Sequence, residues 1–219
     1  MKLTIALGHS AYSNRIKQKT ISVNKFFKGL KNHEVRAKKD GPYFILASFT
    51  KNRRNAYNLD TYYGSAIDLD DTKLSIGEIQ EAFSEFKYVI YTTHSHQSPD
   101  KGDRYRLVIP YSHGVPPEKQ VKTIMMLMHK LGAGNVDLSS KALSRPMYMP
   151  AVPIKYKKHS EVIINNNGKL FDPYVDAALT PEEEWELQES EQDDFKEKFD
   201  PNEAYSEGGR NDALARLTG

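Results

Sequence analysis

The sequence predicts an α+β domain of about 170 residues, with α/β-type alternation of its elements, followed by an acidic segment. Three observations lead to this prediction. Short apolar runs typical of strands alternate with segments whose apolar residues recur at helical spacing. The hydrophobic content of 38% over 219 residues is enough for the core of one full domain. The charge changes sign near residue 171, which marks the end of that core.

The elements follow from the local patterns. Strands are predicted where short, largely apolar runs are bounded by polar or turn-forming residues, at 3–7, 43–49, 65–70, 88–93, 105–110, 146–152 and 161–164. Helices are predicted at 22–30, 76–86 and 117–131. The Asn-Asn-Asn-Gly sequence at 165–168 is a turn signal and predicts a hairpin onto residues 169–171.

Charge is divided unevenly along the chain. Residues 171–219 carry 15 acidic and 4 basic side chains, a net charge of −11, which leaves residues 1–170 with a net charge of +13. A globular part this basic favours a polyanionic partner such as nucleic acid or nucleotides. A basic surface that is merely balanced by an acidic tail is the alternative interpretation.

The same boundary predicts three segments. Residues 1–171 form the folded domain, residues 172–207 form an acidic linker, and residues 208–219 open a further, truncated helical domain. In the linker, Thr180-Pro181-Glu182-Glu183 combines an N-cap, a first-turn proline and acids that complement the helix dipole, so we expect a short helix there.

Several classes of protein are excluded by what the chain lacks. Without cysteine there are no disulfides, no thiolate zinc site and no cysteine nucleophile. No apolar run approaches the roughly 20 residues of a membrane span. The first residues, MKLTIALGHS, are too short an apolar stretch for a signal peptide. We therefore expect a cytoplasmic protein that does not bind a membrane.

The first chemical motif is Ile67-Asp68-Leu69-Asp70-Asp71, at the end of an apolar strand. Residues two apart in a strand face the same side at about 6.5–7 Å. Asp68 and Asp70 therefore point together, while Asp71 points to the opposite face. Two adjacent carboxylates repel unless a cation lies between them, and hard oxygen ligands favour Mg²⁺ or Mn²⁺. An acidic loop at a strand end is the alternative.

The second motif joins a histidine to two arginines. The strand at 88–93 leads into His94, and after a turn Arg104 and Arg106 share one face of the next strand. The simplest connection is an antiparallel hairpin, which brings His94 and both arginines together. Imidazole and guanidinium groups beside a metal-binding pair outline a triphosphate site. A histidine at a strand end can also be structural.

The third motif contains a later acid. Asp137 follows the third predicted helix and a glycine turn, so it can approach Asp68 and Asp70. An aspartate that precedes two serines is also an ordinary turn or cap residue, and both interpretations remain open.

In this order the motifs resemble the archaeo-eukaryotic primase superfamily, in particular the primase-polymerase domains of phage and plasmid replication proteins. The family pattern of acid-hydrophobic-acid, small-x-His and hydrophobic-Asp is matched by Asp68-Leu69-Asp70, Thr92-Thr93-His94 and Val136-Asp137. YTTHSH…RYRLVIP and SRPMYMP look like those members too, and EGGRNDAL looks like the opening of their helical C-terminal domain. The resemblance covers residues 40–155 well and residues 1–40 loosely.

The resemblance implies an RNA-recognition-motif-like catalytic sheet packed on an N-terminal αβ unit. It also implies template-directed nucleotidyl transfer with two divalent ions, Mg²⁺ or Mn²⁺, held by Asp68, Asp70 and Asp137. It assigns His94, Arg104 and Arg106 to the incoming triphosphate, with Arg145 and Lys141 as further candidates. Many relatives carry a zinc element built from cysteine and histidine, which this cysteine-free chain cannot form.

The resemblance further implies partners. These are a single-stranded DNA template, nucleoside triphosphates and, in the full-length protein, a downstream helical domain and a helicase. Arg53 and Arg54, in the basic loop KNRRN, are candidates for holding template or nucleotide, although a solvated loop fits equally well. A phage or plasmid origin in a bacterial or archaeal host is expected.

Three other functions fit parts of the sequence. A non-catalytic module that binds single-stranded nucleic acid would use Tyr88, Tyr105 and Arg106 but leaves the acids unexplained. A haloacid-dehalogenase-like phosphatase would use Asp68 as nucleophile and Asp70 as acid/base, yet a later acidic pair is missing. A rolling-circle nuclease would pair His94 with His96 and use a tyrosine such as Tyr148, without the helical context that such a tyrosine requires.

Overall fold

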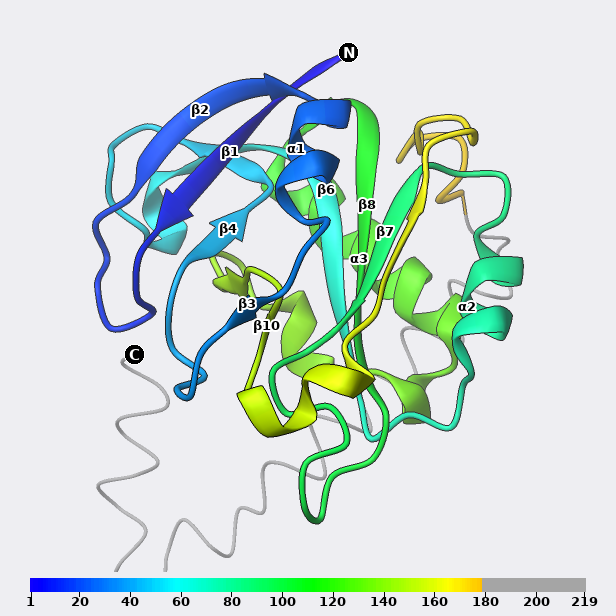
Figure 1. Cartoon of the computed structure of the whole chain (residues 1–219). Helices are drawn as coiled ribbons and strands as arrows, with labels where there is room; N and C mark the ends of the chain where they lie inside the picture. The colour runs from blue at the N-terminus through cyan, green and yellow to red at the C-terminus, as the bar shows by residue number, and fades with distance from the viewer. Residues whose placement is uncertain (179–219) are drawn as a thin grey trace, which may run out of the picture. The chain divides into compact units, whose positions relative to one another are not determined.

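Two antiparallel sheets with helices between and behind them build the domain, and they confirm the predicted α+β class (Figure 1). The computed structural model describes residues 1–178, which form one unit, Met1–Ala178. The folded part therefore extends beyond the expected boundary at 171, because Phe171 and Ala177 are buried. Most of the expected linker, its short helix at 180–183 and the helical segment at 208–219 lie outside the described residues. No helix within residues 1–178 is long and apolar enough to cross a membrane.

The larger sheet has five antiparallel strands in the order β11 (Val162–Asn165), β7 (Tyr88–Thr92), β8 (Arg104–Val115), β6 (Leu59–Asp70) and β5 (Ala47–Phe49). Helix α2 (Ile76–Ala82) links β6 to β7, and helix α3 (Pro117–Leu131) follows β8. Helix α3 packs against β6 and against α2. The chain order β6-α2-β7-β8-α3 follows the β-α-β-β-α part of a split βαβ motif. This is the expected RNA-recognition-motif-like sheet, with the earlier strand β5 at one edge.

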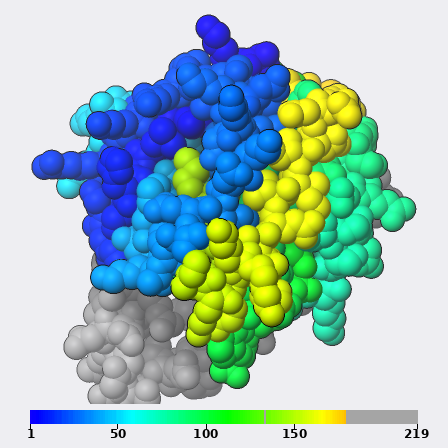
Figure 2. All heavy atoms as spheres, viewed as in Figure 1, coloured from blue at the N-terminus to red at the C-terminus, as the bar shows by residue number. Residues whose placement is uncertain are grey.

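The second sheet is largely N-terminal. Its strands run in the order β2 (Lys17–Ser22), β1 (Lys2–Gly8), β4 (Tyr43–Ile45) and β9 (Met147–Tyr148). A short parallel pair joins β3 (Glu34–Val35) to β10 (Ala151–Val152). In the space-filling view the yellow C-terminal segment accordingly lies against blue N-terminal residues (Figure 2). The N-terminal unit is thus completed by strands that follow residue 146.

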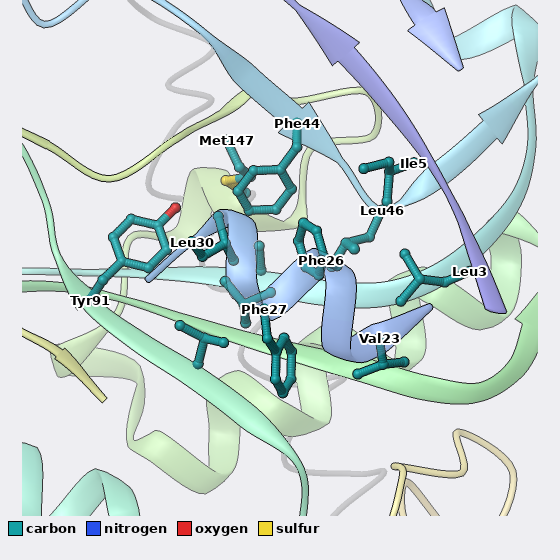
Figure 3. Packing of buried hydrophobic residues seen from close by; sticks show 13 residues of the cluster. Leu3, Ile5, Val23, Phe26, Phe27, Leu30, Phe44, Leu46, Tyr91 and Met147 are labelled. Carbon is teal, nitrogen blue, oxygen red and sulfur yellow. The ribbon is translucent and has the colours of Figure 1, made fainter. Parts of the chain in front are cut away.

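Helix α1 (Val23–Gly29) fills the space between the two sheets (Figure 3). It begins at Ser22, whose side chain accepts a hydrogen bond from the backbone N–H of Lys25. Its Phe26 and Phe27 pack in one buried cluster with Phe44 of the small sheet and Tyr91 of the large sheet.

The structure differs from the predicted elements in several places, and the helix predicted at 76–86 ends at Ala82. The run 43–49 divides at a bend at Leu46 into β4 and β5, and the run 146–152 divides around Pro150, which has no N–H to donate. Strand β2 was not predicted because it is a polar edge strand. The hairpin predicted onto 169–171 is wrong, since Lys169 bridges to Phe86 and Phe171 bridges to Tyr111.

Gly64 lies where the pairing of β6 with β8 shifts register. A Cβ atom at this position would lie 2.6 Å from the Ile109 carbonyl oxygen and 2.8 Å from Leu46 Cδ1. We expect Gly64→Ala to lower the free energy of unfolding by about 1–3 kcal/mol, measured by urea denaturation. Gly29→Ala is the matched control, because no atom lies within 4 Å of its Cβ position. It should be neutral or stabilising by up to about 1 kcal/mol, and equal losses in both variants would contradict this explanation.

Candidate functional site

The pairing of β6 with β8 sets the candidate site. Asp68 lies directly across from Arg106, and Asp70 lies directly across from Arg104. Directly opposed residues of an antiparallel pair share a face, so two carboxylates and two guanidinium groups meet at the end of β6. The strand-spaced acids and arginines predicted from the sequence are therefore brought together, and each acid has its own arginine.

Asp68 and Arg106 form a buried, two-pronged ion pair. Arg106 Nε lies 2.6 Å from Asp68 Oδ1, and Nη2 lies 3.0 Å from Oδ2. Asp68 is 4% exposed and Arg106 is 5% exposed. The remaining nitrogen, Nη1, donates to Tyr91 Oη and to the Tyr148 carbonyl oxygen. Burial acts to raise the pKa of Asp68, but the charges of Arg106 and Arg145 outweigh burial and hold it below its usual range.

Arg145 joins Asp68 to Asp137. Its Nη2 lies 3.1 Å from Asp68 Oδ2 and 2.8 Å from Asp137 Oδ2. The segment that carries Asp137 is also fixed to β6 through the backbone, because Asp137 N donates to Asp68 O and Asp68 N donates to Ser140 Oγ. Asp137 is at once the cap of the 3-10 helix Leu138–Lys141, through Oδ1, and a member of the acidic cluster, through Oδ2. Asp137 is thus a cap residue that also lies beside Asp68, and its role as a metal ligand stays a prediction.

Asp70 and Asp71 hold Arg104 between them. Arg104 Nη1 lies 2.8 Å from Asp70 Oδ2, while Nη2 lies 2.5 Å from Asp71 Oδ2. Asp71 adopts a left-handed backbone with φ of 53°, which turns its carboxylate back toward Arg104 and the Gly102 N–H. The expectation that Asp71 points away is wrong, because the strand ends at Asp70 and alternation no longer applies.

The electrostatics of the cluster show that its carboxylates are neighbours. Burial raises the pKa of Asp70, and the charges of Asp68 and Asp137 raise it further against the opposing effect of Arg104. Burial also acts to raise the pKa of Asp137, but hydrogen bonds from Ser139 and the charge of Arg145 bring it below its usual range. With Asp71 included, four carboxylates face three guanidinium groups, so the cluster has a formal charge of −1.

His94 makes different contacts from those expected. β7 and β8 form the predicted antiparallel hairpin, but Tyr91 is the residue across from Arg106, so alternation places Thr92 on the other face. The prediction that strand alternation places His94 on the same face as Arg104 and Arg106 is therefore wrong. β7 ends at Thr92, and His94 in the following turn donates from Nε2 to the Arg36 carbonyl oxygen at 3.2 Å. Burial, and then the charges of Arg36 and Lys39, lower the pKa of His94.

The remaining predicted basic residues take different positions. Lys141 ends the 3-10 helix and, with Arg145, lines a cavity of about 30 Å³. Arg53 is exposed. Arg54 is half-buried, donates to the carbonyl oxygens of Ala11 and Ser144, and lies over the Tyr43 ring. It therefore joins two loops through their backbone carbonyl groups, which is a structural role, and its contact with template or nucleotide stays a prediction.

Carboxylate oxygens are the donors that a hard divalent cation prefers, and Asp68 and Asp137 lie near enough to Asp70 for their charges to raise its pKa. Within residues 1–178 no three His, Cys, Asp or Glu side chains are arranged around a metal position. In the described arrangement Arg145 occupies the space between Asp68 and Asp137. The carboxylates that a divalent cation would need are thus present, and each of them is paired with a guanidinium group.

The geometry counts against the three other functions. Asp68 is buried in an ion pair, a poor environment for a phosphatase nucleophile. The two histidines of the nuclease motif have separate partners, since His96 Nδ1 accepts from the Arg104 N–H. Tyr148 lies in the strand β9. The contacts expected of a non-catalytic module, Tyr88, Tyr105 and Arg106, are all buried.

Sequence reasoning missed the residues that support the cluster. Asp71 was excluded by alternation, and Tyr91 looked like an ordinary core residue, although its hydroxyl and ring both contact Arg106. Arg36 and Lys39 come from a loop with no motif, yet they lie close enough to His94 to lower its pKa, after the larger effect of burial. The only sequence signal for this loop is the basic run Arg36-Ala37-Lys38-Lys39.

Fold and site together define an α+β domain that gathers carboxylates and arginines at one end of an antiparallel sheet. The chain belongs to the VapE N-terminal domain family, whose model matches residues 13–190. Among solved structures, it is similar to the AEP domain of the primase-polymerase (PrimPol) of Cyanophage S-2L, with 12% identity and a TM-score of 0.47 over 78% of this chain and 86% of that chain. No curated protein matches the chain.

Proposed function

We propose that this domain catalyses template-directed nucleotidyl transfer as the primase-polymerase of a mobile element's replication protein. One observation carries the proposal: Asp68, Asp70 and Asp137 come from two segments at the end of β6, each is paired with an arginine, and Arg145 joins Asp68 to Asp137. Such a set of hard oxygen donors beside guanidinium groups is what phosphoryl transfer requires. Asp70 and Asp137, with the remaining lone pairs of Asp68, would hold two Mg²⁺ or Mn²⁺ ions. When bound, these ions activate the primer 3′-hydroxyl and stabilise the leaving pyrophosphate.

The charge of the cluster supports joint binding of metal and nucleotide. A formal charge of −1 is nearly neutral, so divalent ions alone would make the site strongly positive. A triphosphate that enters with them restores the balance. We therefore expect Mn²⁺ to bind much more tightly in the presence of a non-hydrolysable nucleotide than alone.

The basic residues divide into two roles in this proposal. Arg145 has the most exposed side chain of the three cluster arginines, so it is the one best placed to exchange a carboxylate for a phosphate. Arg104, Lys141 and His94 are also proposed to contact the triphosphate. Each nitrogen of the Arg106 guanidinium already donates a hydrogen bond within the protein, so Arg106 is assigned to positioning Asp68. In the full-length protein we propose a cytoplasmic enzyme followed by a helical domain and a helicase.

A primer-extension assay tests this function. The chain is mixed with a primed single-stranded DNA template, labelled nucleotide, and Mg²⁺ or Mn²⁺. We expect incorporation that requires the metal and changes with the template base. Incorporation that ignores the template base would contradict template direction. Absence of incorporation from a protein that binds both nucleotide and DNA would overturn the enzymatic assignment.

A further inference from the structure

Two loops on the left side of Figure 1 lie side by side, and we name residues 11–19 and 51–59 the basic loop pair. Their backbones are hydrogen-bonded, because Arg54 N donates to Asn14 O at 2.7 Å and Ile16 N donates to Asn52 O at 3.3 Å. An antiparallel bridge also pairs Arg15 with Arg53. The two loops therefore form one continuous surface.

The chemistry of this surface is unusual for a solvated loop. The basic loop pair contains six basic residues and no acidic residue, namely Arg15, Lys17, Lys19, Lys51, Arg53 and Arg54. It also presents two tyrosines, Tyr12 at 94% exposure and Tyr57 at 96% exposure. Two highly exposed aromatic rings among six basic side chains match the requirements of single-stranded nucleic acid, in which bases stack and phosphates need positive charge.

The basic loop pair is joined to the acidic cluster. Arg54 donates to Ala11 O within the pair and to Ser144 O, next to the Arg145 that contacts Asp68 and Asp137. A second link runs through Asp40, which accepts from Ser10 Oγ, from Ala11 N and from Tyr148 Oη. A strand lying on the loop pair would therefore lead toward the candidate site.

We propose that the basic loop pair is a binding surface for single-stranded DNA that guides the template to the acidic cluster. Tyr12 and Tyr57 stack on bases, and Arg15 and Arg53 with the neighbouring lysines pair with phosphates. Single strands are favoured over duplex, because bases must be unpaired to stack on a protein ring. A membrane is a poorer fit, since the one aliphatic side chain beside Arg15, Ile16, is buried. The guiding role rests on the proposed function, whereas the binding itself does not.

Fluorescence anisotropy with a labelled oligothymidine, without metal or nucleotide, tests the binding. We expect Tyr12→Ala combined with Tyr57→Ala to weaken binding at least tenfold. Arg15→Gln combined with Arg53→Gln should reduce the slope of log affinity against log salt by about 1.4, since each lost phosphate contact contributes about 0.7. All four side chains are exposed, so the fold should be kept.

The control variants make the same chemical changes elsewhere. Tyr174→Ala removes another exposed tyrosine, and Lys122→Gln with Lys130→Gln removes two exposed charges from α3. Both should bind oligothymidine like the unmodified protein. Equal affinity in the loop-pair variants and the controls would overturn the proposal. So would a loss confined to anionic lipid vesicles, with DNA binding unchanged.

A second readout separates this proposal from the proposed function. In the primer-extension assay, the loop-pair variants should need more template to reach half-maximal rate. If the unmodified protein binds oligothymidine through the loop pair but never extends a primer, the proposed function fails and the binding surface stands. If it extends primers while the loop-pair variants bind and extend normally, the binding surface fails alone.

Discussion

Asp68→Ala is expected to lower the free energy of unfolding by about 3–5 kcal/mol. The substitution leaves the Arg106 guanidinium buried without its carboxylate partner, at a position that is 5% exposed. A buried charge without a partner is costly because water no longer solvates it. Urea denaturation followed by circular dichroism measures the loss directly.

The double variant Asp68→Leu/Arg106→Met controls for this effect, because it removes both charges and fills the space with apolar atoms. It is expected to be much more stable than Asp68→Ala. If Asp68→Ala instead unfolds at the midpoint of the unmodified protein, the ion pair contributes nothing. The prediction also means that lost activity in Asp68→Ala cannot be attributed to catalysis unless the fold is measured.

Asp70→Asn and Asp137→Asn are expected to reduce primer extension by on the order of 10³-fold, since each removes a charged ligand of the proposed metal site. The stability of Asp70→Asn should be unchanged or raised. Burial and then the neighbouring carboxylates raise the pKa of Asp70 in the folded state, so stability falls as pH rises through the unfolded and then the folded pKa. At neutral pH the ionised carboxylate opposes folding, and a neutral amide removes that cost.

Extension rate and urea midpoint, measured on the same preparations, test this combination of lost activity and kept stability. Asp60→Asn is the matched control, because Asp60 is an exposed acid on the same strand β6. It should leave the extension rate unchanged. Extension by Asp70→Asn at the rate of the unmodified protein would remove Asp70 from the proposed metal site.

Part of this site could be predicted because it depends on short-range geometry. Asp68 and Asp70 lie two apart in a strand, and the same holds for Arg104 and Arg106, so each pair had to share a face. Helix α3 was predicted at its observed bounds, since its apolar residues keep helical spacing over its whole length. These features need no knowledge of what the segments pack against.

The rest depended on relations between segments. Which residue of β7 faces Arg106 is a matter of register, and a shift by one residue exchanges the two faces of the strand. His94 and Asp71 were misplaced because both lie just past a strand end, where alternation stops. The hydrogen bonds of Arg106 come from three distant segments, because its partners are Asp68, Tyr91 and Tyr148. No local sequence pattern encodes such a combination.

The late strands β9 and β10 have a consequence for how the protein is made. They pair with β4 and β3, so the N-terminal sheet is finished only when residues 147–152 have been synthesised. During synthesis on the ribosome, β3 and β4 therefore have unpaired edges until β9 and β10 have been made. Completion of the small sheet depends on contacts between residues far apart in the sequence. We expect folding to be slow and all-or-none, with the acidic cluster assembled in the same step that closes the small sheet, because Arg145 immediately precedes β9.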